Sequence, residues 1–382
     1  MKIIICPDSF KGSLSASDAA AAIDAGVASA FSDAKRELIP LADGGEGTVD
    51  ALTSVSGGQI INLEVAGPLG EPVQAYYGVM GDGKTAVIEM AAASGLDLVP
   101  SAKRDPRFTT TYGTGQLILD AYNRGYRSLI IGIGGSATND AGTGALSALG
   151  VRFLDAHGQV LPPGGAALAH LSKIDTSAMK IDPSILNIRV ACDVTNPLVG
   201  PEGASVVYGP QKGASSEIAR ELDDALKNFA SIVERDLGIT IANTPGAGAA
   251  GGLGAGLMAF LDAHLESGID IVLDVTRFDD RINDAHLILT GEGRVDRQTA
   301  FGKVISGVLK RAKRAGVPVV VIAGGVGEGS ELLYPLGATG IFSIAPGPIT
   351  LEESINSTRE LLSRTAENIV RVYAAGRASK ST

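Results

Sequence analysis

The chain has 382 residues, a hydrophobic fraction of 45%, a charged fraction of 19% and a formal net charge of −10. The length predicts two domains. The acidic balance argues against nucleic acid as a partner, because nucleic-acid binding favours a basic face. The two cysteines, Cys6 and Cys192, lie far apart, and the first residues lack an apolar run long enough for a signal peptide, so we expect a cytoplasmic protein.

The N-terminal segment alternates strands and helices. A strand is predicted over residues 2–6 and a helix from Ser15 or Ser17 to about residue 31. A second strand over 37–41 and a helix over about 47–55 follow. Two strand–loop–helix units in succession predict the beginning of a parallel sheet.

Residues 61–90 have a different pattern, in which alternating segments are separated by turn residues, as in β-hairpins. Residues 78–85 match the P-loop expression G-x-x-x-x-G-K-[ST]. A P-loop needs a helix directly after it, whereas here a strand pattern continues after Asp82-Gly83. We therefore interpret residues 78–85 as a hairpin turn.

The rest of the chain returns to alternating apolar segments and glycine-rich turns. The predicted strands are 128–133, 151–155, 188–192, 287–290, 317–323 and 340–345, and the predicted helices are 114–123, 215–237 and 352–375. The uncharged stretch 237–261 could span a bilayer by length, but its glycines and proline make it a poor membrane helix. No membrane association is expected.

These elements predict an α/β protein with two domains. Residues 1–60 and 285–382 form an open α/β domain from both chain ends, and residues 61–284 form an inserted mixed α/β domain.

A glycine-rich segment follows the predicted strand 128–133 and precedes a helix. Backbone N–H groups at Gly134 and Gly135 could close on an anion, and Ser136, Thr138 and Asn139 add neutral polar groups. The alternative is a tight structural turn. We favour a site for substrate or phosphate.

Carboxylates follow two further strands. Asp43 lies in a flexible glycine segment, and Glu292 and Asp296 flank Arg294 after strand 287–290. Mg²⁺ takes hard oxygen ligands and keeps several waters, so one or two carboxylates suffice. The alternatives are helix capping at Asp43 and a surface ion-paired turn around Arg294.

Three more segments are candidates. Asp8, Ser9 and Lys11 follow the first strand, where Lys11 could meet phosphate or carboxylate and Asp8 could orient Lys11 or bind metal. Asp193, after strand 188–192, is either a catalytic base or part of an Asx-turn. Residues 245–256 form either a second anion-binding loop or a close helix contact.

Glycine and acid loops at strand ends are the parts that phosphoryl transfer requires, namely phosphate positioning, a divalent metal and a base near the acceptor hydroxyl. The sequence has no protein-kinase signature, so we expect an acceptor that is not a protein.

At these motifs the chain resembles the glycerate kinase type-1 family. The resemblance is carried by CPDSFKGSLSA (6–16), ADGGEGT (42–48), EMAAASGL (89–96), GIGGSATND (132–140), ACDVTNPLVG (191–200), GPQKGAS (209–215), PGAGAAGGLGAG (245–256) and LTGEGRVD (289–296). It implies a flavodoxin-like domain with an inserted second domain, ATP and Mg²⁺ as cofactors, and D-glycerate phosphorylated at the 2-hydroxyl. Cys6 and Ala141 depart from the expected Ala and Gly, and neither change removes a polar group.

The resulting hypothesis is a catalytic cleft between the two domains. The loop Gly134–Ser136 and Lys11 would hold phosphate or the glycerate carboxylate. Asp193 would accept the hydroxyl proton and Arg294 would stabilise charge in transit. Mg²⁺ would be held by three carboxylates: Asp43, Glu292 and Asp296.

The alternatives are a glycerate 3-kinase, a kinase of another small hydroxy acid and a non-catalytic small-molecule binding protein. A homo-oligomer is also compatible with the sequence.

Overall fold

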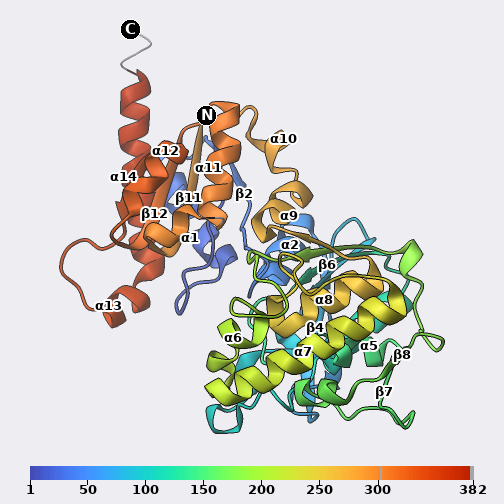
Figure 1. Ribbon diagram of the computed structural model, residues 1–382. Coiled ribbons are helices and arrows are strands. Elements are labelled where there is room, and N and C mark those ends of the chain that lie inside the picture. Colours follow the sequence, from blue (N-terminus) through green and yellow to red (C-terminus); the bar gives the residue numbers. More distant parts are fainter. Residues whose placement is uncertain (302, 379–382) are drawn as a thin grey trace. The chain divides into compact units, whose positions relative to one another are not determined.

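The computed structural model describes residues 1–301 and 303–378, which form two compact units (Figure 1). The terminal unit contains Met1–Asp43, Asp50–Ser56 and the residues from Ile269 onward. The central unit contains Gly44–Val49 and Gly57–Gly268. The division therefore falls within the ADGGEGT motif, between Asp43 and Gly44.

The terminal unit is built on one parallel sheet of five strands in the order β13-β12-β11-β1-β2. Numbered within this unit alone, the order is 2-1-3-4-5, as in flavodoxin-like folds. The strands are β1 (Lys2–Ile5), β2 (Lys35–Leu38), β11 (Leu287–Val295), β12 (Val319–Val326) and β13 (Ala338–Ser343). The expectation of a flavodoxin-like parallel-sheet domain from both chain ends is confirmed.

Helices cover both faces of this sheet. Ile3 and Ile5 belong to a core shared with α1 (Ala16–Ala30) and α14 (Thr358–Ala378). Ile4 points to the opposite face and is also fully buried. On α11 (Val304–Ala315), Val304, Ile305, Val308 and Leu309 are fully buried, and this helix contacts β11 and β12. The remaining helices are α2 (Thr48–Ser56), α9 (Gly268–Val275), α10 (Phe278–Ile282), α12 (Leu333–Leu336) and α13 (Leu351–Asn356).

Helices α1 and α14 approach each other closely at Gly26. A Cβ atom added at Gly26 would lie 1.9 Å from the carbonyl oxygen of Ser363. We expect Gly26→Ala to lower the free energy of unfolding of the terminal unit by about 3 kcal/mol, because packed backbone must move apart. Urea unfolding measures this. Gly376→Ala, on an exposed turn of α14 with nothing within 4 Å of the added Cβ, should be neutral or slightly stabilising. An equal loss in both variants would contradict the packing argument.

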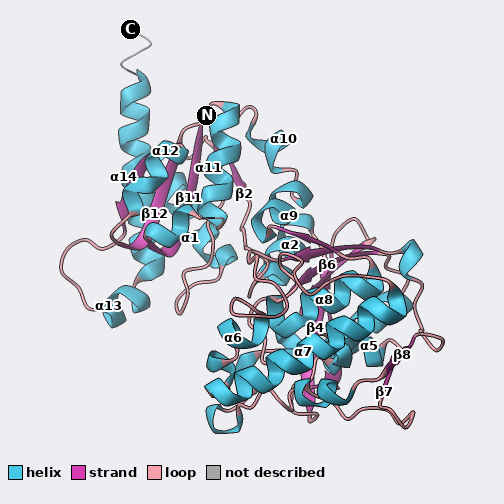
Figure 2. Cartoon of the chain, viewed as in Figure 1, coloured by secondary structure: helices cyan, strands magenta, loops and turns pink. Residues whose placement is uncertain are grey.

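The central unit contains a mixed sheet of six strands in the order β10-β9-β6-β5-β4-β3 (Figure 2). Strands β10, β9, β6 and β5 are parallel, and β4 and β3 continue the sheet antiparallel. The strands are β3 (Gln59–Ala66), β4 (Pro72–Val79), β5 (Thr85–Glu89), β6 (Ser128–Gly132), β9 (Asn187–Ala191) and β10 (His264–Glu266), and a separate antiparallel pair is formed by β7 (Arg152–Leu154) and β8 (Lys173–Asp175).

One hydrophobic core joins this sheet to its helices. It includes Ile131 of β6, Leu117 of α4, Phe229 of α7 and Leu253 of α8. The helices are α3 (Ala91–Ser94), α4 (Tyr112–Asn123), α5 (Thr143–Ala148), α6 (Ala204–Tyr208), α7 (Ser216–Leu237) and α8 (Ala249–Leu261). The predicted helix over 215–237 is confirmed, with Ser215 accepting a bond from the Ile218 N–H at its start.

The hairpin interpretation of residues 78–85 is confirmed. Strands β4 and β5 pair antiparallel, and Asp82 accepts hydrogen bonds from the backbone N–H groups of Lys84 and Thr85. No helix follows, so this segment lacks the geometry of a P-loop.

The units differ from the predicted boundaries at residues 44–49 and 57–60, which lie in the central unit, and at residues 269–284. Helices α9 and α10 belong to the terminal unit, because Ile269 packs on Gly307 of α11 and Arg311 of α11 pairs with Asp270, Asp274 and Asp279. Among the described residues, no helix is both long enough and apolar enough to cross a membrane.

Candidate functional site

In the terminal unit, the strand order reverses direction between β1 and β11. Open α/β sheets bind ligands at the carboxyl ends of the strands at such a switch point. Asp8 follows β1, and its N–H donates to the carbonyl of Gly291 at 2.8 Å. Glu292 is the next residue of β11, so two predicted site residues come from the two strands at this point.

Asp8, Asp43 and Glu292 form an acidic group in the terminal unit. The pKa of Asp8 is raised to about 7, chiefly by burial and also by the carboxylates of Asp43 and Glu292, while the Ser9 N–H and Lys11 lower it. The Ser9 N–H donates to Asp8 Oδ1 at 2.6 Å. Asp8 therefore interacts with the predicted residues Ser9 and Lys11 and with two of the predicted metal ligands.

Glu292 is held by a residue that sequence reasoning missed. Thr299 Oγ1 donates to Glu292 Oε1 at 2.6 Å and accepts from the Asp296 N–H at 3.2 Å. Burial raises the pKa of Glu292, while the Thr299 bond and Lys303 lower it. The sequence carries no signal for Thr299, because its role depends on the turn that returns it to β11.

Asp296 has a local structural role. Its Oδ1 accepts from the Gln298 N–H at 2.9 Å and its Oδ2 from Arg294 Nε at 3.3 Å, and it caps a short 3₁₀-helix, Arg297–Ala300. Arg294 is mostly exposed. Both oxygens of Asp296 therefore have hydrogen-bond partners within its own turn, which gives Asp296 a structural role there.

Within the described residues, no group of three or more carboxylate, imidazole or thiolate side chains is arranged to hold a metal ion. A dedicated protein cage for Mg²⁺ is thus not present there. Mg²⁺ that arrives with substrate phosphates needs only one or two carboxylates, because it retains waters. The carboxylates of Asp43 and Glu292 raise the pKa of Asp8, and that of Asp43 raises the pKa of Glu292, so these groups lie close enough to fit that lesser requirement.

The raised pKa of Asp8 predicts a pH effect on stability. An acid whose pKa is 3.8 unfolded and about 7 folded stabilises the fold fully below pH 4, and this contribution is lost as pH rises towards 7. We expect the free energy of unfolding, measured by urea in EDTA, to fall between pH 5 and pH 8 by on the order of 2 kcal/mol more in the wild type than in Asp8→Asn. Parallel pH profiles would contradict the assignment.

In the central unit, four parallel strands end along one line. Glu89 of β5 is in register with Gly132 of β6, Gly132 with Ala191 of β9, and Ala191 with Glu266 of β10. The glycine loop and the segment containing Asp193 therefore leave the same edge of this sheet. Gly44 lies at this edge too. A Cβ atom added at Gly44 would meet the side chain of Ala191, and one added at Gly132 would meet the carbonyl oxygen of Gly44.

The loop after β6 has two exposed glycines, Gly134 and Gly135, followed by the buried Ser136. Gly135 has φ +74°, in the left-handed region. The loop is fixed by bonds from the Leu96 N–H to the Gly135 carbonyl and from the Ala137 N–H to the Ser94 carbonyl. Among the described residues, the N–H groups of Gly134 and Gly135 have no protein partner. This leaves two exposed donors in a fixed loop.

Thr138 and Asn139, which the sequence predicts as neutral groups for binding a ligand, are fully buried. Asn139 Nδ2 donates to Ser205 Oγ at 2.9 Å, whereas Thr138 Oγ1 and Asn139 Oδ1 have no hydrogen-bond partner among the described residues. The next residue, Asp140, accepts four bonds, from the N–H groups of Thr111, Gly142 and Gly144 and the Thr111 hydroxyl. The side chains of Thr138, Asn139 and Asp140 are therefore part of the protein interior and not of the exposed surface of the loop.

The glycine-rich segment 245–256 packs against this loop. A Cβ added at Gly251 would lie 2.0 Å from the Thr138 carbonyl oxygen, and one at Gly256 would lie 2.4 Å from the Ala141 carbonyl oxygen. The Ala141 N–H donates to the Gly251 carbonyl at 3.0 Å. Of the two alternatives left open by the sequence, the structure favours close packing, with α8 supporting the loop.

Asp193 is exposed and follows β9. Its Oδ1 accepts from the Gly268 N–H at 3.0 Å, which fixes the carboxylate relative to the end of β10. This is the geometry of an oriented, solvent-accessible carboxylate and suits a proton acceptor.

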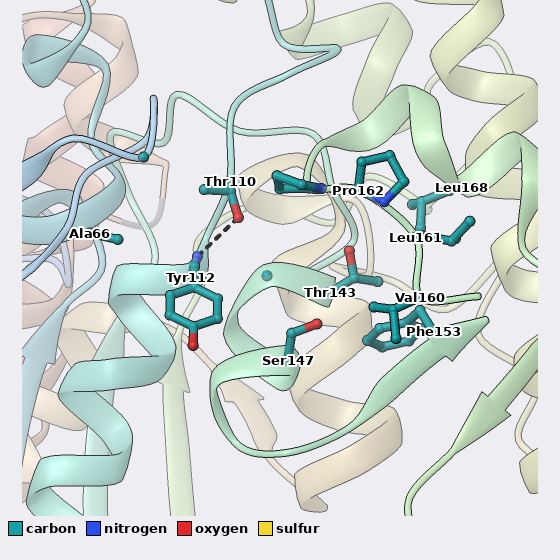
Figure 3. Close-up of a pocket in the computed structure, with 13 residues that line it drawn as sticks. Ala66, Thr110, Tyr112, Thr143, Ser147, Phe153, Val160, Leu161, Pro162 and Leu168 are labelled. Carbon is teal, nitrogen blue, oxygen red and sulfur yellow. Dashed lines mark hydrogen bonds between the residues drawn. The ribbon is translucent and has the colours of Figure 1, made fainter. Parts of the chain in front are cut away.

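A separate cavity of about 390 Å³ lies in the central unit (Figure 3). Its walls are largely apolar, with Phe153, Leu161 and Leu168 on one side and Tyr112 on another. Among the described residues that line it, none carries a carboxylate, amine or guanidinium, and none is a predicted site residue. The cavity thus provides no charged group for a phosphate or carboxylate.

Sequence reasoning also gave no role to Lys212, which reaches the glycine loop from 76 positions away. Its segment, GPQKGAS, was recognised only as part of the resemblance. A lysine between glycines in a loop is expected to be exposed to solvent, and only the tertiary structure shows that Lys212 is buried.

A flavodoxin-like sheet with acidic groups at its switch point, and a second sheet with an exposed glycine loop and an oriented carboxylate at its edge, define an α/β enzyme acting on small anionic substrates. The model of the glycerate kinase family matches residues 3–374. The chain belongs to the glycerate kinase family.

Individual relatives agree with this assignment. The chain is 53% identical over 369 residues to a glycerate kinase of Bacillus subtilis strain 168, covering 97% of each. It is 49% identical over 378 residues to a glycerate 2-kinase of Escherichia coli K12, covering 98% of this chain and 99% of that one. A crystal structure from Salmonella typhimurium LT2, assigned as glycerate kinase 2, is 48% identical with a TM-score of 0.91, covering 99% of both chains.

Proposed function

We propose that this protein transfers the γ-phosphoryl group of ATP to the 2-hydroxyl of D-glycerate, giving 2-phospho-D-glycerate and ADP. The observation that carries the proposal is the identity of about half of all residues, over nearly the full length, with proteins named glycerate kinase. The 2-hydroxyl is favoured because one of these relatives is a glycerate 2-kinase.

The residues of the central unit would accept a proton from the acceptor hydroxyl and bind an anionic oxygen of a substrate. Asp193, oriented by the Gly268 N–H, would accept the proton of the attacking hydroxyl. The exposed N–H groups of Gly134 and Gly135 would bind an anionic oxygen, either of carboxylate or of phosphate. The glycine loop and Asp193 follow the carboxyl ends of the neighbouring strands β6 and β9.

The residues of the terminal unit would act on the nucleotide phosphates. Glu292 and Asp43 would hold Mg²⁺ through oxygen, with Asp8 adjacent, and Mg²⁺ when bound would neutralise phosphate charge. Lys11 and the exposed Arg294 would add positive charge towards phosphate. The interaction of Lys11 with Asp8 keeps this lysine near the acidic group.

A phosphorus NMR spectrum of the folded protein with ATP, Mg²⁺ and D-glycerate tests the proposal. A 2-phosphoglycerate signal supports it. A 3-phosphoglycerate signal would keep the kinase activity and reject the 2-hydroxyl. If no phosphorylated glycerate forms, a panel of other hydroxy acids separates another kinase from a protein that binds without turnover.

A further inference from the structure

Lys212 is a buried lysine that the proposed function does not use. Its side chain is 2% exposed, and it lies at the end of a 3₁₀-helix, Pro210–Lys212. Gly213 has φ +99°, and a Cβ there would lie 2.2 Å from the Arg104 carbonyl oxygen; one at Gly209 would lie 2.2 Å from that of Ser205. The two glycines let the segment pack tightly enough to direct Lys212 inward.

The ammonium group of Lys212 supports the glycine loop from behind. Nζ donates to Ser136 Oγ at 2.6 Å and to the Thr138 carbonyl at 2.7 Å. These bonds hold the residues that directly follow Gly134 and Gly135. Helix α8 also packs against this segment of the chain, at Thr138 and Ala141.

The bond to Ser136 also excludes one direction for the hydrogen of the serine hydroxyl. A hydroxyl has one donor hydrogen, and an ammonium has no acceptor site. Because Ser136 Oγ accepts from Lys212, the serine O–H cannot point back at the ammonium and is available to donate elsewhere. Ser136 is 8% exposed and directly follows the exposed glycines, so its hydroxyl is a third donor available next to them.

The charge of Lys212 has no bonded counter-ion among the described residues. Its two hydrogen bonds go to neutral oxygens. The nearby Asp140 attracts it but already accepts four other hydrogen bonds. Burial lowers the pKa of Lys212 to about 7. A buried cation without a paired anion is costly, and an anionic ligand at the loop would offset that cost.

We propose that Lys212 is a positioning residue that orients Ser136 and places positive charge beneath the Gly134–Ser136 loop, making this loop the binding site for one anionic group of a substrate. This rests on the proposed function for the identity of the substrates. The shared chemistry is a carboxylate or phosphate oxygen bound by two backbone N–H groups and a serine hydroxyl. The glycerate carboxylate and an ATP phosphate are its two sources.

Lys212→Met tests the proposal, because methionine is unbranched, has a similar volume, lacks only the position of Nζ and removes the charge. We expect the KM for one substrate, D-glycerate or ATP, to rise by about 10-fold or more, with the other KM changed less than about twofold. A selective rise for D-glycerate identifies the carboxylate, and one for ATP identifies the phosphate. The matched control is Lys227→Met, on an exposed lysine of α7 in the same unit, which should leave both constants unchanged.

A purely structural role predicts a different result. In that case the variant would lose active protein, lowering kcat per mole with both KM values unchanged, or would raise both KM values together. Either result overturns the proposal, as does wild-type behaviour in all constants. Wild-type turnover is measured first, so that an inactive wild type counts against the proposed function and not against Lys212.

Ser136→Ala keeps the test decisive if Lys212→Met does not fold, as judged by circular dichroism and thermal unfolding. This variant keeps the lysine and removes only the oriented hydroxyl. We expect the KM of a single substrate to rise by about 3- to 10-fold, and the same substrate as for Lys212→Met where both variants fold. Unchanged KM values in folded Ser136→Ala would overturn the proposal.

Discussion

Replacing Asp193 with asparagine should lower kcat for D-glycerate phosphorylation by about 10²-fold or more. Asparagine can still accept the Gly268 N–H bond through its amide oxygen, so the segment after β9 should keep its position. It cannot accept the proton of the acceptor hydroxyl. The measurement is steady-state kinetics at saturating ATP and Mg²⁺, with KM for both substrates expected to change little.

The matched control for this prediction is Asp182→Asn. Asp182 is also exposed, lies in the same unit and accepts a backbone bond, from the Ser184 N–H at 3.0 Å. Its replacement should leave kcat unchanged. Near-normal turnover in Asp193→Asn would reject the role of base, and Asp193 would then be a residue that fixes the end of β10.

Replacing Glu292 with glutamine should also lower kcat by about 10²-fold at low Mg²⁺, with part of the loss recovered at high Mg²⁺. The amide keeps an oxygen acceptor for the Thr299 hydroxyl but loses the negative charge that attracts the cation. Activity measured against Mg²⁺ concentration at fixed ATP should show a midpoint shifted to higher Mg²⁺. Chelation with EDTA should abolish turnover in the wild type.

Glu331→Gln provides the comparison, because Glu331 is an exposed glutamate of the same unit. Its Mg²⁺ midpoint should match that of the wild type. If Glu292→Gln instead lowers kcat equally at every Mg²⁺ concentration, Glu292 acts through the structure of β11 and its turn rather than through the metal.

Local features of the fold could be predicted from the sequence because neighbouring residues determine them. Ser15 caps α1 through the Asp18 N–H, and Ser215 caps α7 through the Ile218 N–H. Asp82 closes the β4–β5 hairpin by accepting bonds from the N–H groups two and three residues later. These interactions depend on residues within three positions, so the motif alone carries the information.

From the sequence, the residues of the candidate site could be predicted only by their position at the ends of predicted strands. Asp8, Gly134 and Asp193 follow strands, and Glu292 lies in the last part of β11. The carboxyl ends of parallel strands share one edge, so the proximity of such residues within each sheet could be expected. The sequence did not distinguish Asp296, which caps its own turn through the Gln298 N–H, from Glu292, whose hydrogen-bond partner Thr299 lies seven positions away.

Properties that depend on burial and on distant contacts were determined only by the tertiary structure. The raised pKa of Asp8 requires desolvation and the carboxylates of Asp43 and Glu292, which are 35 and 284 positions away. The support of the glycine loop by Lys212 joins residues 76 positions apart. The sequence by itself determined the main strands and helices, their order and the family. The fold decided which charged groups lose water and which partners they meet, because desolvation and long-range packing are set by the whole chain.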